Sequence, residues 1–142
     1  MNVKVVYFSR TGTSKRVAEK IAKELSCEVI EILDGINWNG VSGYIKAGYY
    51  SLRKKDVEIK INGNIDKADE FIVVSPLWAG GPPPAVRTFL KKMAFNTIHL
   101  VITSNASDVR SYPEFKSVSE IIKKKNNEDL VIQTLAKKLQ GI

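Results

Sequence analysis

The sequence predicts an α/β protein with a doubly wound parallel sheet and helices on both faces. Two observations carry this prediction: short apolar runs alternate with helical patterns, and central runs such as residues 71–75 are continuously apolar. Alternating strands and helices are typical of a parallel sheet, and a strand covered on both faces needs apolar side chains on both. The chain of 142 residues contains no linker, repeat or low-complexity segment. A single domain spanning residues 1–142 is therefore expected.

The first half of the chain combines strong and weak patterns. Residues 3–8 form an apolar run, and the next stretch repeats apolar residues at the spacing of one helix face. A small and apolar face on residues 41–55 indicates a second helix, and alternation in residues 57–61 indicates a short edge strand. The elements predicted here are strands at 3–8, 27–33 and 57–61 and helices at 13–25 and 41–55.

The second half is clear except around residues 114–125, which fit both a helix and a strand. We prefer a strand, because the sheet needs a fifth strand before the final helix. Pro84 suits the first turn of a helix, Asn127 with the acidic residues after it is typical of a helix start, and Gly141 is typical of a helix end. The elements predicted here are strands at 71–75, 98–103 and 117–123, a turn of helix at 113–116, and helices at 85–93 and 128–140.

A turn rich in hydroxyl side chains joins the first predicted strand to the first predicted helix. Its sequence is Ser9-Arg10-Thr11-Gly12-Thr13-Ser14. The N–H groups at a helix N-terminus bind anions, short hydroxyls add donors, and Gly12 permits a close backbone approach or a positive φ. The turn lacks the glycine pattern of dinucleotide folds and the Gly-Lys-Ser/Thr ending of triphosphate loops. It therefore predicts a site for a phosphate monoester, the alternative being a helix cap with a glycine turn.

Charge and composition narrow the class of protein. The formal net charge is +7, but the basic residues are spread over predicted helix faces and ends, which favours solvated faces over a nucleic-acid surface. No apolar run reaches membrane-spanning length, and no secretory signal is expected. Cys27 is the only cysteine, interpreted as a buried strand thiol, and the cytoplasm is favoured. With His99 as the only histidine, the sequence predicts no zinc site.

Three motifs make the sequence resemble the flavodoxin family over most of its length. The turn Ser9-x-Thr11-Gly12-x-Ser14 is similar to the family's phosphate loop. Residues 75–81, followed by 84–90, are similar to its third-strand loop and helix, and residues 43–53 resemble a helix found in a subset of these proteins. The resemblance implies the strand order 2-1-3-4-5, with the ligand beyond the carboxyl ends of the strands.

The resemblance implies flavin mononucleotide (FMN) as the cofactor. Its phosphate is expected on the first loop and its ring among the loops after the third and fourth strands. Trp78 stands where the family places a stacking aromatic. The alternative is an ordinary core residue, but a Trp in a Pro/Gly loop at a strand end is poorly placed for the core. Tyr112 is either the second stacking aromatic or a partly exposed residue before a helix. The residues implied in cofactor binding are Ser9, Arg10, Thr11, Gly12, Thr13, Ser14, Pro76, Leu77, Trp78, Ala79, Gly80, Ser104, Asn105, Asp108 and Tyr112.

Two further expectations concern the ring and its charge. Gly80 lets the preceding peptide turn, so the Ala79 carbonyl is the candidate acceptor for the hydrogen that flavin N5 gains on reduction. Carriers in the family are usually acidic, whereas this chain is basic and has Arg10 in its phosphate loop. Positive charge stabilises reduced flavin, so a less negative reduction potential is expected. The C-terminal third is short for the family, so its fourth helix is expected to be reduced.

The preferred function is electron transport by a cytoplasmic FMN protein, with the redox chemistry supplied by the cofactor and no catalytic side chain required. The expected partners are redox proteins, acidic ones included, rather than nucleic acid or a membrane. A monomer or a weak dimer is expected. One alternative is an oxidoreductase, an FMN-dependent NAD(P)H reductase of quinones or similar acceptors, although no motif marks a nicotinamide site. The second alternative is a flavin-free basic binding module.

Overall fold

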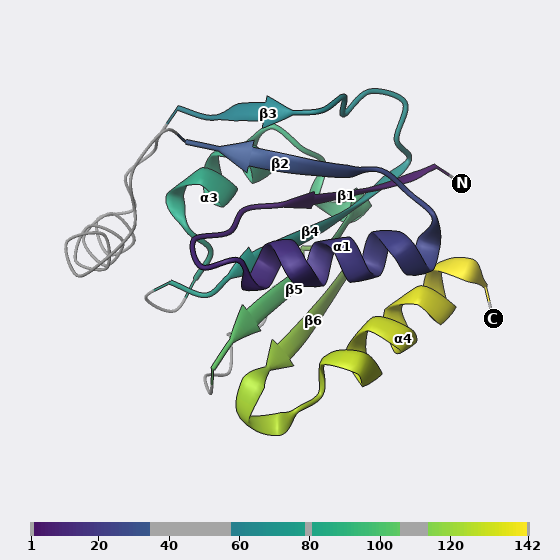
Figure 1. Ribbon diagram of the computed structural model, residues 1–142. Coiled ribbons are helices and arrows are strands. Elements are labelled where there is room, and N and C mark those ends of the chain that lie inside the picture. Colours follow the sequence, from purple (N-terminus) through teal and green to yellow (C-terminus); the bar gives the residue numbers. More distant parts are fainter. Residues whose placement is uncertain (1, 35–57, 79–80, 106–113, 142) are drawn as a thin grey trace.

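A six-stranded, mostly parallel sheet with helices on both faces forms the protein (Figure 1). The computed structural model describes residues 2–34, 58–78, 81–105 and 114–141. The strands are β1 (Val3–Tyr7), β2 (Val29–Leu33), β3 (Lys60–Asn62), β4 (Glu70–Pro76), β5 (Ile98–Ser104) and β6 (Ser117–Ile122). The helices are α1 (Thr13–Leu25), α3 (Pro84–Lys91) and α4 (Glu128–Gln140), with 3-10 turns η1 (Phe95–Thr97) and η2 (Lys123–Lys125).

The strand order is β3-β2-β1-β4-β5-β6. Every neighbouring pair is parallel except β2 and β3, which pair antiparallel. The five parallel strands therefore follow the predicted order 2-1-3-4-5, and the predicted edge strand is the sixth, at 60–62 rather than 57–61. The predicted doubly wound α/β fold is confirmed. The helix predicted at 41–55 lies outside the described residues.

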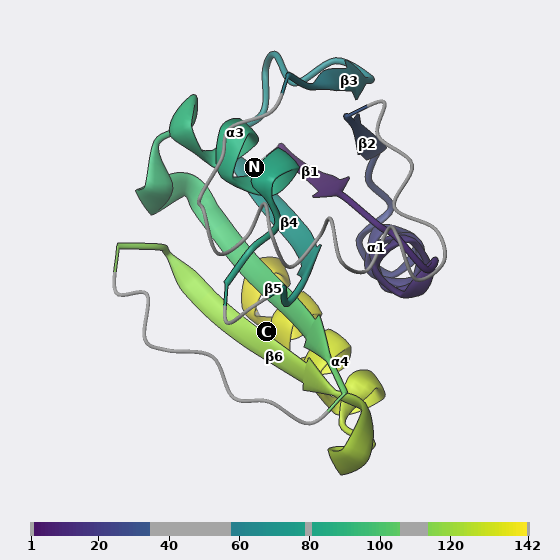
Figure 2. The same ribbon diagram turned by 90° about the vertical axis from the view of Figure 1, so that its left-hand side faces the viewer.

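The two faces of the sheet are covered by different helices. α1 and α4 pack on one face, where Val5, Ile72 and Val101 contribute from the strands. α3 packs on the other face, against Val6, Val73 and the other strand residues whose side chains point to that face. Figure 2 shows this division, with α3 on one side of the sheet and α1 and α4 on the other. The central strands are buried on both faces, which is why their sequences are continuously apolar rather than alternating.

Local signals set the ends of the helices. α1 occupies the predicted residues 13–25 and stops at Ser26, whose φ of 52° is left-handed. α4 occupies the predicted residues 128–140 and stops at Gly141, with a φ of 75°, where glycine carries no steric penalty. Asn127 precedes α4 as predicted, but its side chain instead accepts from the Ile122 N–H (2.8 Å) and donates to the Glu120 carbonyl (3.0 Å).

Three smaller expectations were wrong. Cys27 lies in the connection before β2 rather than in the strand, and it is half-buried; this burial raises the pKa of the thiol. Of the helical turn predicted at 113–116, the described residues 114–116 form a turn and bends without helix. α3 ends at Lys91 rather than residue 93, because the Lys92 and Met93 N–H groups close back on Phe89 and Leu90.

A buried polar cluster lies at the amino ends of the strands. His99 of β5 is 1% exposed, and both ring nitrogens have partners: Nε2 contacts Glu70 Oε1 at 2.7 Å and Nδ1 contacts Ser117 Oγ at 2.7 Å. The second oxygen of the Glu70 carboxylate accepts from Lys116. Burial by itself would raise the pKa of Glu70, but hydrogen bonds from Lys116 and His99 outweigh it and hold that pKa below its usual range. The cluster joins β4, β5 and β6.

An ion network joins α1 to α4, the two helices that cover the same face of the sheet. Glu128, at the start of α4, receives Arg16 Nη1 at 2.5 Å and Lys20 Nζ at 2.7 Å from α1. Lys20 also contacts Asp129 at 2.8 Å. The hydrogen bond from Arg16, helped by Lys20, lowers the pKa of Glu128 from 4.5 to about 2 against the opposing effect of burial.

Loss of the Glu128 charge is expected to destabilise the protein in acid. Because the folded pKa lies below the unfolded one, this stabilisation is present above pH 4.5 and is lost as the pH falls toward about 2. Arg16 and Lys20 are partly solvated, so we expect the Glu128 charge to contribute only about 1 to 2 kcal/mol to the free energy of unfolding. Urea unfolding at pH 7 and pH 3 measures this loss of stability. Glu128→Gln should unfold more easily at pH 7 and lose less stability on acidification than wild type; equal acid losses in the two proteins would contradict the assignment.

Candidate functional site

Three loops meet at the carboxyl edge of the parallel strands. The Phe8 N–H donates to the Val74 carbonyl at 3.2 Å, which joins the end of β1 to β4. The Leu77 N–H donates to the Thr103 carbonyl at 3.1 Å, which joins the loop after β4 to β5. Ligands of open α/β sheets bind at this edge, where neighbouring connections leave toward opposite faces. Here that point lies between β1, which leads to α1, and β4, which leads to α3.

The hydroxyl-rich turn forms an open N-terminus for α1. Gly12 precedes the helix with a φ of 95°, and no side chain of the described residues caps the first turn. The Gly12 N–H donates to Ser9 Oγ at 2.8 Å, and the hydroxyls of Thr11 and Thr13 lie 3.5 Å apart on the exposed side of the loop. A Cβ at Gly12 would meet no atom within 4 Å. The first helix N–H groups therefore have no side-chain cap from Gly12 and are open to an anion.

Ser14 links the start of α1 to the sheet. Its side chain is buried, and its hydroxyl lies 3.1 Å from Thr103 Oγ1 near the end of β5. This pair holds the first turn of α1 against the sheet. Where Thr103 is the donor of this bond, the Ser14 hydroxyl keeps its own O–H for an anion, beside the Ser14 backbone N–H. Arg10 is half-buried in the same loop.

Trp78 is a core residue, contrary to the expectation that its loop position keeps it out of the core. It is 9% exposed, and its ring packs edge-to-face on Phe8, with centroids 5.7 Å apart. Trp78 and Gly81 exchange two backbone hydrogen bonds, of 2.7 and 3.0 Å. The indole is thus buried against Phe8, which proximity to Pro and Gly alone does not reveal.

The other predicted residues are divided between the site and the undescribed segments. Pro76 and Leu77 are half-buried at the end of β4, and Ser104 is half-buried at the end of β5. Asn105 is exposed, and its carbonyl accepts from the Lys124 N–H at 3.0 Å. The predicted residues Ala79, Gly80, Asp108 and Tyr112 lie outside the described residues. Sequence reasoning missed Phe8 and Thr103; their signal was their position at the carboxyl ends of two apolar strands.

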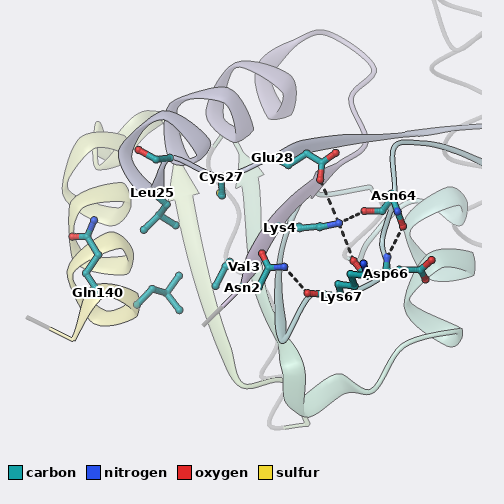
Figure 3. Close-up of a pocket in the computed structure, with 12 residues that line it drawn as sticks. Asn2, Val3, Lys4, Leu25, Cys27, Glu28, Asn64, Asp66, Lys67 and Gln140 are labelled. Atoms are coloured by element: carbon teal, nitrogen blue, oxygen red, sulfur yellow. Dashed lines mark hydrogen bonds and ion pairs between the residues drawn. The ribbon is translucent and has the colours of Figure 1, made fainter.

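A hollow of about 600 Å³ lies at the opposite, amino edge of the sheet, between the start of β1 and the end of α4 (Figure 3). Lys4 points into it and contacts the carbonyls of Asn64 and Asp66 and, at 3.3 Å, the Glu28 carboxylate. These three partners match the three N–H bonds of an ammonium. Lys4 therefore ties the start of β1 to the 64–66 turn and to the residue before β2.

Neither a metal centre nor a membrane-spanning helix is present among the described residues. They contain no cluster of three or more His, Cys, Asp or Glu side chains placed to hold a metal ion. None of the helices found in them has the length and hydropathy needed to cross a membrane.

Comparison with known proteins places the chain. A protein of Archaeoglobus fulgidus, described as uncharacterized, is 32% identical over 114 residues, which cover 77% of this chain and 70% of the archaeal one. The chain belongs to the same family as that protein. No family model matches it.

Solved structures share its fold, which is flavodoxin-like. A Lactobacillus acidophilus flavoprotein in complex with FMN is 22% identical, with a TM-score of 0.65 over 92% of this chain and 97% of that one. A protein of Bacteroides uniformis is 20% identical, with a TM-score of 0.73 over 94% and 97%. Oxidised flavodoxin 1 of Bacillus cereus is 12% identical, with a TM-score of 0.51 over 100% and 99%.

Proposed function

We propose that the chain binds FMN at the carboxyl edge of its sheet and acts in electron transfer. The observation that carries this proposal is the open N-terminus of α1, preceded by Gly12 with a positive φ, at the point where connections leave toward opposite faces. The Lactobacillus acidophilus flavoprotein of the same fold holds FMN. This supports the choice of FMN among phosphate monoesters.

The loop residues fit the phosphate of FMN. A phosphate dianion is stabilised by the partial positive charge and unpaired N–H groups of a helix N-terminus. Ser9, Thr11 and Thr13 would add hydroxyl donors, and the open space beside Gly12 leaves room for close approach. Arg10 would add positive charge and thereby favour the reduced, more anionic cofactor.

The ring would lie among the loops after β4 and β5. Pro76 and Leu77 offer half-buried surface on one side, and Asn105 offers an exposed amide on the other. Flavin supplies hydride or single-electron chemistry when bound. The protein's part is to bind and orient it and to restrict water at its edge. The stacking role of Tyr112 and the acceptor role of the Ala79 carbonyl remain parts of this proposal.

Gly12→Val is expected to weaken FMN binding by about tenfold or more, because a β-branched residue disfavours the left-handed backbone and fills the anion space. Quenching of flavin fluorescence on titration measures the dissociation constant. Gly141→Val is the matched control: its φ is also positive, and a Cβ added there would likewise meet no atom within 4 Å. Both variants should lose about 1 to 2 kcal/mol of stability, but only the first should lose affinity.

The electron-transfer part is tested by supplying NAD(P)H to the FMN-loaded protein. We expect negligible direct oxidation of the nucleotide, with bleaching of the flavin absorbance only after a separate reductase is added. Rapid oxidation by the pure protein would replace the carrier role with a reductase activity. A wild-type protein that binds no FMN would overturn the proposal as a whole.

A further inference from the structure

The corner between β6 and α4 combines positive charge with an exposed apolar side chain. We call residues 123–130 the basic corner; it comprises η2, the Asn126–Asn127 link and the first residues of α4. Lys123 and Lys124 are exposed, as is Lys125. Leu130 is 71% exposed, and Leu33 is the only other exposed large hydrophobic residue in the described part of the chain. This segment therefore carries exposed positive charge together with one exposed aliphatic side chain.

The basic corner is held in one conformation before any partner binds. The Asn127 side chain bridges the Ile122 N–H and the Glu120 carbonyl, as described above. The Lys124 N–H donates to the Asn105 carbonyl at 3.0 Å, which ties η2 to the end of β5. A preorganised surface loses less conformational entropy on binding than a floppy one.

The acidic residues at the start of α4 are already engaged by α1. Glu128 is held by Arg16 and Lys20, and Asp129 by Lys20. Their charges are therefore balanced from within the fold. The lysines of η2 contribute the net positive charge of this corner.

The corner also lies on the same edge of the sheet as the candidate FMN site. η2 follows the carboxyl end of β6 directly, and its Lys124 is bonded to Asn105, which follows β5 (Figure 1). A protein bound here would stand beside the loops proposed to hold the flavin.

We propose that the basic corner docks an acidic electron-transfer protein, with Lys123 and Lys124 pairing with its carboxylates and Leu130 entering an apolar contact. The role of the docked protein as an electron partner rests on the proposed FMN function. Complementary charge would set the orientation and the rate of encounter, and the buried leucine would provide an anchor. The exposed leucine favours a protein over nucleic acid, whose backbone is matched by cations alone.

The test uses an oxidised, acidic [2Fe–2S] ferredoxin as the probe and isothermal calorimetry with the protein both before and after FMN is added. We expect binding that weakens with added salt, and a dissociation constant raised by about tenfold in both K123Q/K124Q and L130S. K137Q/K138Q removes the same charge from exposed lysines at the far end of α4 and should bind like wild type. Circular dichroism and thermal melting check that each variant is folded.

Three outcomes would overturn the proposal: no salt-sensitive binding, equal weakening by both lysine pairs, or tighter binding of a DNA duplex or of anionic vesicles than of the ferredoxin. An FMN titration of the same proteins separates the two proposals. Affinity for FMN should be unchanged in K123Q/K124Q. A wild type that binds ferredoxin but not FMN would refute the cofactor while leaving the docking surface in place.

Discussion

Glu70→Ala is expected to lower the free energy of unfolding by about 3 kcal/mol. Glu70 is 6% exposed, and its two oxygens serve His99 and Lys116. The substitution leaves one nitrogen of a buried imidazole without its partner and separates the hydrogen-bonded ends of β4, β5 and β6. Lys116 is about half exposed and can turn to water, so most of the loss comes from His99.

Urea unfolding at neutral pH measures this loss. Glu114→Ala removes an exposed carboxylate from the turn that leads into β6 and should change stability by less than about 0.5 kcal/mol. Because the pKa of Glu70 is lowered in the folded protein, its stabilisation is complete above its unfolded pKa of 4.5 and falls as the pH drops through the folded value. A Glu70→Ala protein as stable as the Glu114→Ala control would show that the cluster contributes nothing.

The order of strands and helices was predictable because most elements have a signal within their own residues. The apolar face of α1 repeats with the helical period, and β4 and β5 are continuously apolar because both of their faces are covered. Even the ambiguous segment 117–122 was assigned correctly to a strand. That assignment came from the requirement of the sheet rather than from the segment itself.

The polar pairs were not predictable in the same way, because their partners lie far apart in the sequence. Ser14 and Thr103 are 89 residues apart, and Glu70 and His99 are 29 apart. Nothing in the sequence around either residue of such a pair identifies its partner. Only the register of β4 with β5, and the packing of α1 on the sheet, brings them together. The sequence could indicate that the hydroxyl loop binds an anion, but not that the Ser14 hydroxyl contacts Thr103.

Trp78 shows how the same limit affects a predicted site residue. Its position after a parallel strand was correctly recognised, and the loop does lie at the carboxyl edge of the sheet. The backbone of Trp78 is bonded to Gly81, and its ring packs on Phe8. These contacts belong to the tertiary structure, so the ring was expected outside the core and lies within it.

Trp78→Ala is therefore expected to reduce stability by about 3 to 5 kcal/mol, as for other large buried aromatic residues. Trp78→Phe keeps an aromatic ring against Phe8 and should lose only about 1 to 2 kcal/mol. With so little of the indole exposed, we expect the folded Trp78→Phe protein to bind FMN within about threefold of wild type, a difference below 1 kcal/mol. Urea unfolding and flavin-fluorescence titration measure the two effects separately. A tenfold loss of FMN affinity in a stable Trp78→Phe protein would instead mean that the ring leaves its contact with Phe8 to stack on the flavin, as the sequence predicted.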